Sequence, residues 1–249
     1  MRKALLTILF IIAAVALSAQ NEWSYRLSFS GELRSGVVNA TVLKNSGGIE
    51  RNDSLIALSA NYGISYGMKD MTTYDLGFTS TLKADLWQYD RWSPFVLVNY
   101  LNNKFKGFEY KLNYLAGAKY RIYTRPKICD YSISAAYVMD YTEYFSKDRN
   151  DERFKPQVSR ISLRFKVKRR INDIIYLNHM TFYQPSLMEL RGWKSVKDDY
   201  IVTSITSFEN RIGKNIFLDI NFNYEYRSLV TDGVSHRDII TSATLRVKF

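Results

Sequence analysis

The last residues of this 249-residue chain alternate between two kinds of side chain. Phe249, Val247 and Leu245 fall on one face of a strand, and Lys248 and Arg246 fall on the other, because successive side chains in a strand point to opposite faces. One face suits lipid and the other suits water. The pattern predicts a strand of a transmembrane barrel that ends at an aromatic carboxy terminus.

The same period of two recurs along most of the chain. In residues 23–34, Trp23, Leu27 and Leu33 alternate with polar side chains, and residues 216–227 are equally regular. Comparable patterns cover residues 55–66, 74–87, 111–123, 131–144 and 159–168, and less regular ones cover residues 93–105, 175–184 and 200–211. The sequence therefore predicts an all-β chain that forms an antiparallel transmembrane barrel of about 12 strands.

The strand count depends on the amino-terminal region. A barrel whose two ends lie on the same side needs an even number of strands, so residues 36–43 are predicted as a twelfth strand that pairs with the first. Residues 45–53 are rich in Gly and Asn, and this composition predicts an irregular segment after that strand.

The amino terminus has the features of a secretory signal. Arg2 and Lys3 form a short basic region, residues 4–17 are mainly apolar, and the small residues Ser18 and Ala19 follow. The apolar run is shorter than the ~20 residues that a membrane-spanning helix needs. We therefore predict cleavage after Ala19, with residues 1–19 as the signal peptide and residues 20–249 as the barrel.

Composition agrees with this class. The chain is 15% aromatic with 19 Tyr, and its mean hydropathy is −0.24. Transmembrane barrels carry aromatic girdles at both bilayer interfaces, and only every second residue of a strand meets lipid. Cys129 is the single cysteine, which excludes an intramolecular disulfide.

Loop lengths predict the orientation, because such barrels have short periplasmic turns and longer outer loops. Residues 88–91, 124–127, 170–173 and 213–215 are predicted as periplasmic turns. Residues 146–156 and 185–199 are the longest and most charged connections and are predicted to face outward. The predicted location is the outer membrane of a Gram-negative bacterium.

Particular segments resemble a known family. They are Trp92-Ser93-Pro94-Phe95, residues 110–120, residues 182–187, the start of the strand at residues 200–202 and the closing strand. The chain resembles the outer-membrane barrels grouped as domain of unknown function 481, in the form common in Bacteroidota. This resemblance implies a barrel in the outer membrane, and it implies no activity because members share no established one. The terminal Phe249 resembles the signal that the barrel-insertion machinery reads.

Charged residues line the predicted inner face. The basic ones are Lys111, Lys119, Arg121, Arg160, Arg164, Lys166 and Lys168, and the acidic ones are Asp75, Asp85, Asp140, Asp219 and Glu225. Buried unpaired charge is expensive, so these groups either pair across the interior or are solvated by water. A barrel of about twelve strands is compatible with a narrow pore and with a plugged interior.

No catalytic, metal or cofactor site is predicted. The two histidines exclude a site of three imidazoles. His236 lies near Asp232 and Ser235, as is usual in a polar hairpin loop, and His179 is read as a packing or lumen histidine. Asp148, Asp151 and Glu152 alternate with basic residues, which favours a solvated loop over a cation site.

The leading hypothesis is a non-enzymatic envelope protein that forms a narrow channel with a mildly anion-favouring lumen. The alternative is a structural or adhesion-type barrel with a plugged lumen that acts through its outer loops, and a lipid-modifying hydrolase is a distant third hypothesis.

The formal net charge is +11, yet the basic residues are spread singly along alternating strands, so a nucleic-acid partner is not expected. The expected partners are outer-membrane lipid and lipopolysaccharide, which the outer-loop basic residues would meet, and the insertion machinery, which would read the carboxy-terminal strand. The oligomeric state stays open.

Overall fold

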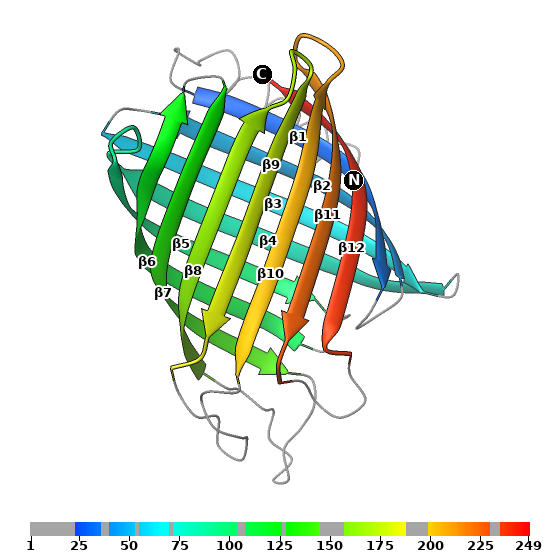
Figure 1. Ribbon diagram of the computed structural model, residues 1–249. Helices are drawn as coiled ribbons and strands as arrows, with labels where there is room; N and C mark the ends of the chain where they lie inside the picture. The colour runs from blue at the N-terminus through cyan, green and yellow to red at the C-terminus, as the bar shows by residue number, and fades with distance from the viewer. Residues whose placement is uncertain are drawn as a thin grey trace.

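The computed structural model describes residues 23–35, 40–52, 55–69, 72–103, 108–125, 128–144, 157–187, 199–229 and 235–249. These residues form one closed antiparallel barrel, in which each strand pairs with its sequence neighbours and β12 pairs with β1 (Figure 1). The predicted barrel of about twelve strands is confirmed. Among the described residues, no helix is long and apolar enough to cross a membrane. The predicted signal peptide lies outside the described residues.

The twelve strands are β1 (Trp23–Ser35), β2 (Ala40–Asn52), β3 (Ile56–Lys69), β4 (Thr72–Leu86), β5 (Trp92–Asn103), β6 (Phe108–Arg125), β7 (Cys129–Tyr144), β8 (Gln157–Arg170), β9 (Ile175–Pro185), β10 (Tyr200–Arg211), β11 (Ile216–Arg227) and β12 (Arg237–Lys248).

The carboxy terminus closes the barrel. β12 pairs with β1 from Lys248 opposite Arg26 to Ile239 opposite Ser35. Beyond this ladder, the backbone N–H of Phe249 donates to the Tyr25 carbonyl at 2.9 Å, and the N–H of Tyr25 donates to the Phe249 carbonyl at 3.1 Å. The last residue of the chain therefore contributes two backbone hydrogen bonds to closure.

The second strand corrects one prediction. β2 pairs with β1 as expected, but it runs to Asn52 through the segment that was predicted to be irregular. Neighbouring side chains occupy the space beside these glycines: a Cβ on Gly47 would lie 2.6 Å from the Tyr62 ring, and a Cβ on Gly48 would overlap the Asn61 amide. The glycines therefore accommodate cross-strand packing, as in aromatic rescue of strand glycines. Residues 36–39, the start of the predicted strand, lie outside the described residues.

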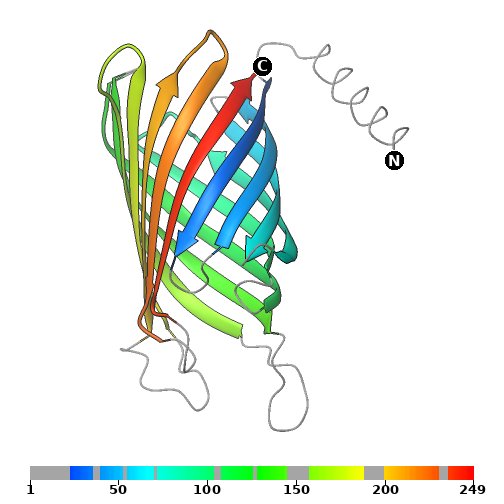
Figure 2. The same ribbon diagram turned by 90° about the vertical axis from the view of Figure 1, so that its right-hand side faces the viewer.

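The turns and loops fall into two groups, according to the end of the barrel at which they join the strands. The described turns 87–91, 171–174 and 212–215 lie with Phe249 at one end, which we call the carboxy-terminal end (Figures 1 and 2). β6 ends and β7 begins at this end too, next to the predicted turn at residues 124–127, of which residues 126 and 127 are outside the described part. The strands that flank the predicted outer loops, β7 with β8 and β9 with β10, meet at the opposite end; residues 146–156 and most of 185–199 lie outside the described residues.

The outer wall is apolar and aromatic. Leu33 is 65% exposed and Leu76 is 66% exposed, whereas Asp85 and Asp219 are each 9% exposed. Tyrosine rings meet on the outer wall near the opposite end, where Tyr200 lies 5.9 Å from Tyr226 between ring centroids. Exposed apolar side chains and enclosed polar ones are the reverse of a water-soluble fold and match a wall that faces lipid.

Gly117 provides a test of packing in the wall. A Cβ at Gly117 would overlap the Ala135 carbonyl oxygen and lie 2.6 Å from the Ala136 Cα, whereas a Cβ at Gly31 would meet nothing within 4 Å. Replacing Gly117 with Ala should lower the free energy of unfolding by about 1–3 kcal/mol through overpacking, whereas Gly31→Ala should leave it unchanged or raise it slightly. Urea unfolding of the barrel in detergent measures both, and equal stability of the two variants would contradict the described packing.

Candidate functional site

The candidate site is the inner face of the barrel. Paired residues on neighbouring strands share a face, so one inward position fixes the others around the ring. Lys119, Ser134 and Arg164 form one inward row across β6, β7 and β8, and Arg121, Ser132 and Lys166 form the next row. The basic residues of β6 and β8 therefore flank a strand whose inward side chains are short.

The structure puts the predicted lumen residues into different environments. Lys111 pairs with Asp140, Arg160 pairs with Asp199 at 2.7 Å, and Arg121 lies 3.3 Å from Asp130. Asp85 pairs with Lys83, Asp219 pairs with Arg246 at 3.0 Å, and Glu225 pairs with Arg227 at 2.9 Å. Lys119, Arg164, Lys166 and Lys168 form no ion pair within the described part of the chain. The side chain of Asp75 lies outside the described residues.

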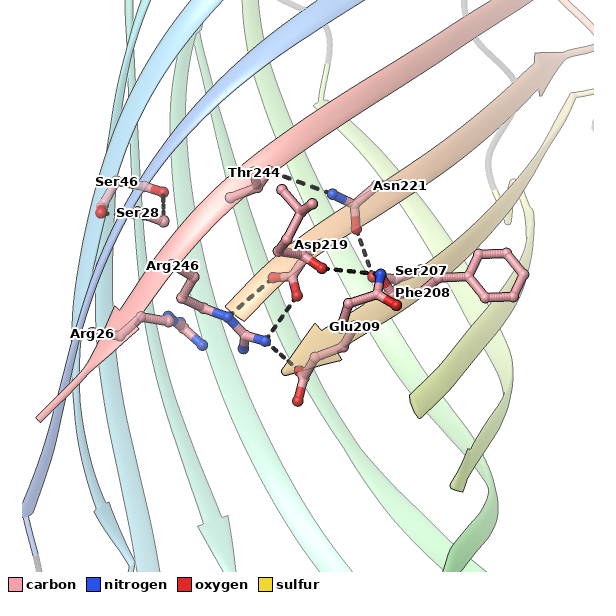
Figure 3. A network of polar contacts seen from close by, with 12 residues as sticks. Arg26, Ser28, Ser46, Ser207, Phe208, Glu209, Asp219, Asn221, Thr244 and Arg246 are labelled. Carbon is pink, nitrogen blue, oxygen red and sulfur yellow. Dashed lines mark hydrogen bonds and ion pairs between the residues drawn. The ribbon is translucent and has the colours of Figure 1, made fainter. Parts of the chain in front are cut away.

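A network of polar contacts surrounds Arg246 on β12 (Figure 3). Its guanidinium donates to Asp219 on β11 at 3.0 Å and to Glu209 on β10. The Arg246 Cζ also lies 5.1 Å from the centroid of the Phe217 ring. One arginine thus ties together three successive strands.

An uncharged network continues along the same wall. The Ser207 hydroxyl donates to the Asn221 side-chain oxygen at 2.6 Å, and the Asn221 amide donates to Ser242 at 3.2 Å and Thr244 at 3.4 Å (Figure 3). On the other side of the β1–β12 closure, Ser28 on β1 and Ser46 on β2 share a hydrogen bond of 2.7 Å. These contacts, like those of Arg246, run around the wall.

All ion pairs between described residues follow the wall. Arg26 pairs with Glu50 on the next strand at 3.5 Å, and Arg34 pairs with Glu32 on its own strand at 2.8 Å. The widest pairs, from Arg246 to Glu209 and from Arg160 to Asp199, reach two strands away. The basic residues of the predicted rows form no ion pair with Asp219 or Glu225 among the described residues, although Lys111 on β6 lies within electrostatic range of Glu225 on β11.

The two ends of the lumen differ in charge pairing. Toward the opposite end, each inward basic side chain among the described residues has an acidic partner: Arg34, Lys44, Lys111, Arg160 and Arg227. From mid-strand to the carboxy-terminal end, six inward basic side chains have no ion pair among the described residues: Lys119, Arg164, Lys166, Lys168, Arg211 and Lys248. Uncompensated positive charge is therefore concentrated toward the carboxy-terminal end.

A cavity of about 660 Å³ opens at that end. Its lining includes Arg121, Lys168 and Arg211 together with Asp130 and Glu209. Part of the basic lining is already engaged. Arg121 donates to the Tyr89 and Gln88 carbonyls at 2.8 and 2.7 Å, and Arg211 donates to the Gly213 carbonyl at 3.2 Å. At this opening, some basic side chains donate hydrogen bonds to backbone carbonyls and others make no such contact within the described part of the chain, and all of them surround a water-accessible space.

Several important residues were absent from the predicted site. Arg246, Lys248, Glu209, Lys83 and Asp130 all face inward, and the alternation of their strands carried the signal for them. Asp199 is different, because it precedes β10 and its contact with Arg160 joins segments 39 residues apart. No local pattern in the sequence indicates that contact.

The histidines lie away from the lumen charges. His179 lies on the outer face, where its ring contacts the Thr206 hydroxyl at 2.9 Å and the Thr181 hydroxyl at 3.0 Å, so its side chain is not in the lumen. The His236 Nδ1 lies 2.8 Å from the Arg227 carbonyl, and the Ser235 hydroxyl donates to the Arg237 carbonyl. Asp232 lies outside the described residues, as do Asp148, Asp151 and Glu152. Among the described residues, no three His, Cys, Asp or Glu side chains gather to hold a metal ion.

Comparison with known proteins agrees with this architecture. Residues 27–249 match the family described as "Protein of unknown function, DUF481". A comparison with curated proteins found no match.

Three solved structures are similar in fold. The NanC porin structure has a TM-score of 0.59 at 13% identity, with 90% of this chain and 100% of that chain covered. The COG4313 outer membrane channel from Pseudomonas putida F1 has a TM-score of 0.53 at 8% identity, with coverage of 93% and 97%. The translocator domain of autotransporter NalP from Neisseria meningitidis has a TM-score of 0.53 at 7% identity, with coverage of 100% and 96%. At these identities the likeness shows the fold of an outer-membrane barrel.

The Arg246 network makes a stability prediction. Arg246→Met would leave Glu209 and Asp219, whose side chains are 19% and 12% exposed, without their main counterion. We expect a loss of about 2 kcal/mol or more in the free energy of unfolding, with partial recovery when Glu209→Gln and Asp219→Asn are added. Arg26→Met is the matched control, because the pair between Arg26 and Glu50 is 33% and 39% exposed and should contribute less than about 1 kcal/mol. Urea unfolding compares the four proteins, and equal losses for the two arginine variants would contradict the assigned role.

Proposed function

This chain belongs to the DUF481 family, whose match covers residues 27–249, and we propose that it is an outer-membrane channel that favours small anionic solutes. The proposed location is the outer membrane of a Gram-negative bacterium. The alternating strands and the fold likeness to a porin and to an outer membrane channel support both parts of the proposal. The proposal assigns no enzymatic activity to the barrel.

One observation carries the anion preference. Six inward basic side chains toward the carboxy-terminal end have no ion pair among the described residues, while those toward the opposite end are paired. Charged side chains that line a pore at close range set its ion selectivity. A surplus of positive charge raises the local concentration of anions and excludes cations.

The arrangement of ion pairs supports a lumen that water can enter. Within the described part of the chain, the ion pairs run around the wall, and none of them fastens opposite walls together. Unpaired lysine and arginine side chains are also expensive to bury in a dry interior, so their presence favours hydration. If ion pairs crossed the interior instead, the barrel would be plugged and would have a structural role.

Reversal potential tests the channel. We expect the purified protein to form conductance steps in planar bilayers and to prefer chloride over potassium in a KCl gradient. In the Arg164→Glu and Lys166→Glu double variant, the permeability ratio should shift toward cations by about twofold or more, because two unpaired lumen cations become anions. Arg169→Glu is the matched control, since Arg169 lies on the same strand but is exposed on the outer face. Absence of conductance at high protein density would contradict the proposed channel. An unchanged permeability ratio in the folded double variant would contradict the assigned selectivity.

The same proposal includes partners at the membrane. Outer-membrane lipid would contact the apolar wall, and lipopolysaccharide phosphates would meet basic residues of the outer loops. The insertion machinery would read the terminal strand through the Phe249 ring, which is 69% exposed.

Phe249 allows recognition to be separated from closure. Phe249→Ala keeps the backbone hydrogen bonds with Tyr25, so the variant should refold in detergent as the parent does. Its assembly in the outer membrane of cells should nevertheless fall several-fold, whereas Phe249→Tyr should assemble well. Quantification of the heat-modifiable band in membrane fractions measures assembly, and parental yield of Phe249→Ala would show that the ring is not the signal.

A further inference from the structure

Three unpaired cations gather on one part of the lumen wall. Lys119 on β6 and Arg164 on β8 are both opposite Ser134 on β7, and Lys166 is opposite Ser132 one row closer to the carboxy-terminal end. The backbones of β6 and β8 lie ~10 Å apart, and successive inward positions on β8 lie ~7 Å apart. Long basic side chains at these three positions can therefore reach a common point above β7.

The strand between them leaves room for such convergence. Ser132 is 1% exposed and Ser134 is 8% exposed, so both hydroxyls lie beneath the longer neighbouring side chains. The next inward residue, Ala136, is also small and buried. The wall at β7 is therefore a shallow floor bordered by basic groups on two sides.

The charges around the cluster do not cancel. The charged groups that act on Lys166 include Arg164, Lys168 and Lys119, against the single acid Asp130. Asp130 lies 3.3 Å from Arg121, and Asp85, the other acid that acts on Lys119 and Arg164, pairs with Lys83 through one carboxylate oxygen. Within the described residues, these two acids are thus shared with cations outside the cluster and cannot neutralise its three positive charges.

Hydrogen-bonding capacity is also unused. The Arg164 Cζ lies 6.0 Å from the Phe95 ring centroid, and its Nε is a buried donor without a partner among the described residues. Lys119 and Lys166 make no hydrogen bond, ion pair or ring contact with any described residue. Buried donors in native proteins are normally satisfied, and an ionised acceptor makes the strongest partner.

We propose that Lys119, Arg164 and Lys166 form a binding site for one small oxyanion, a phosphate or carboxylate group of the solute. The bound group relieves the repulsion among the three cations and accepts the free donors, and the Ser132 and Ser134 hydroxyls lie beneath it. The site deepens the proposed function, on which its role in transport rests, because it names the group that the channel selects. Permeation requires the site to be weak enough for release, so affinity in the millimolar range is expected.

Binding can be measured without conductance. The folded barrel in detergent micelles is titrated with inorganic phosphate by isothermal calorimetry at low ionic strength, with folding checked by heat-modifiable mobility. We expect saturable binding that weakens at least tenfold in the Lys119→Gln and Lys166→Gln double variant. Binding should stay within about threefold of the parent in the Lys119→Arg and Lys166→Arg double variant, which keeps the charges.

Lys44→Gln is the matched control, because Lys44 is an inward lysine on the distant wall that lies 3.9 Å from its partner Glu32. It should bind phosphate within about twofold of the parent, since its charge is already compensated. Absence of saturable binding in the parent, or equal weakening by Lys44→Gln and by the Gln double variant, would overturn the site. If phosphate binding depends on Lys119 and Lys166 in a barrel that does not conduct, the site stands and the channel fails. If the barrel conducts anions but binds phosphate equally well in both double variants, the site fails and the channel stands.

Discussion

Closure of the sheet between β1 and β12 is the constraint on which the rest of the structure depends. In a lipid environment each unsatisfied backbone N–H or carbonyl group costs several kcal/mol, so a sheet is stable there only without free edges. The ladder from Lys248 opposite Arg26 to Ile239 opposite Ser35, extended by Phe249, removes the last two edges. Closure also fixes which side chains point inward, because a slip of one residue would turn each strand inside out.

The polar side chains that point inward must then form hydrogen bonds or ion pairs with one another or with water. On the wall formed by β10, β11 and β12, Arg246 does so with Glu209 and Asp219. On the wall formed by β6, β7 and β8 the acids are too few, and Lys119, Arg164 and Lys166 lie unpaired around short serines. On the first wall the charges pair and form a structural network. On the second wall the unpaired cations form a surface that attracts anions. The proposed transport function follows from that difference between walls.

Alternation was sufficient to predict most of the fold. β10 begins and ends at Tyr200 and Arg211 as predicted, and most other strands differ from prediction by a few residues at their ends. The exception is β2, where Gly47 and Gly48 read locally as a break. These glycines leave space for the side chains of Tyr62 and Asn61 on β3, and no sequence pattern within β2 indicates this contact. Cross-strand packing of this kind depends on register, which the sequence alone does not provide.

The ion pairs of the lumen side chains were less predictable from the sequence than the face of the strand on which those side chains lie. Alternation indicated that Arg160, Arg164 and Lys166 share a face, yet it could not separate Arg160, which binds Asp199, from its two unpaired neighbours. That distinction arises from a contact between distant segments. One member of this row is held by an ion pair, and we propose that the other two are available to a solute.

Water access to the wall of β7 tests the central claim most directly. In a protein with Cys129 replaced by Ser, a cysteine introduced by Ser134→Cys would lie between Lys119 and Arg164 in the lumen. Its rates of modification by a negatively and a positively charged methanethiosulfonate of similar size report both hydration and local potential. If the lumen is hydrated and positive at this wall, the folded barrel reacts with both reagents and reacts several-fold faster with the anionic one at low salt. No reaction until the barrel is unfolded, or faster reaction with the cationic reagent, would contradict the proposed lumen.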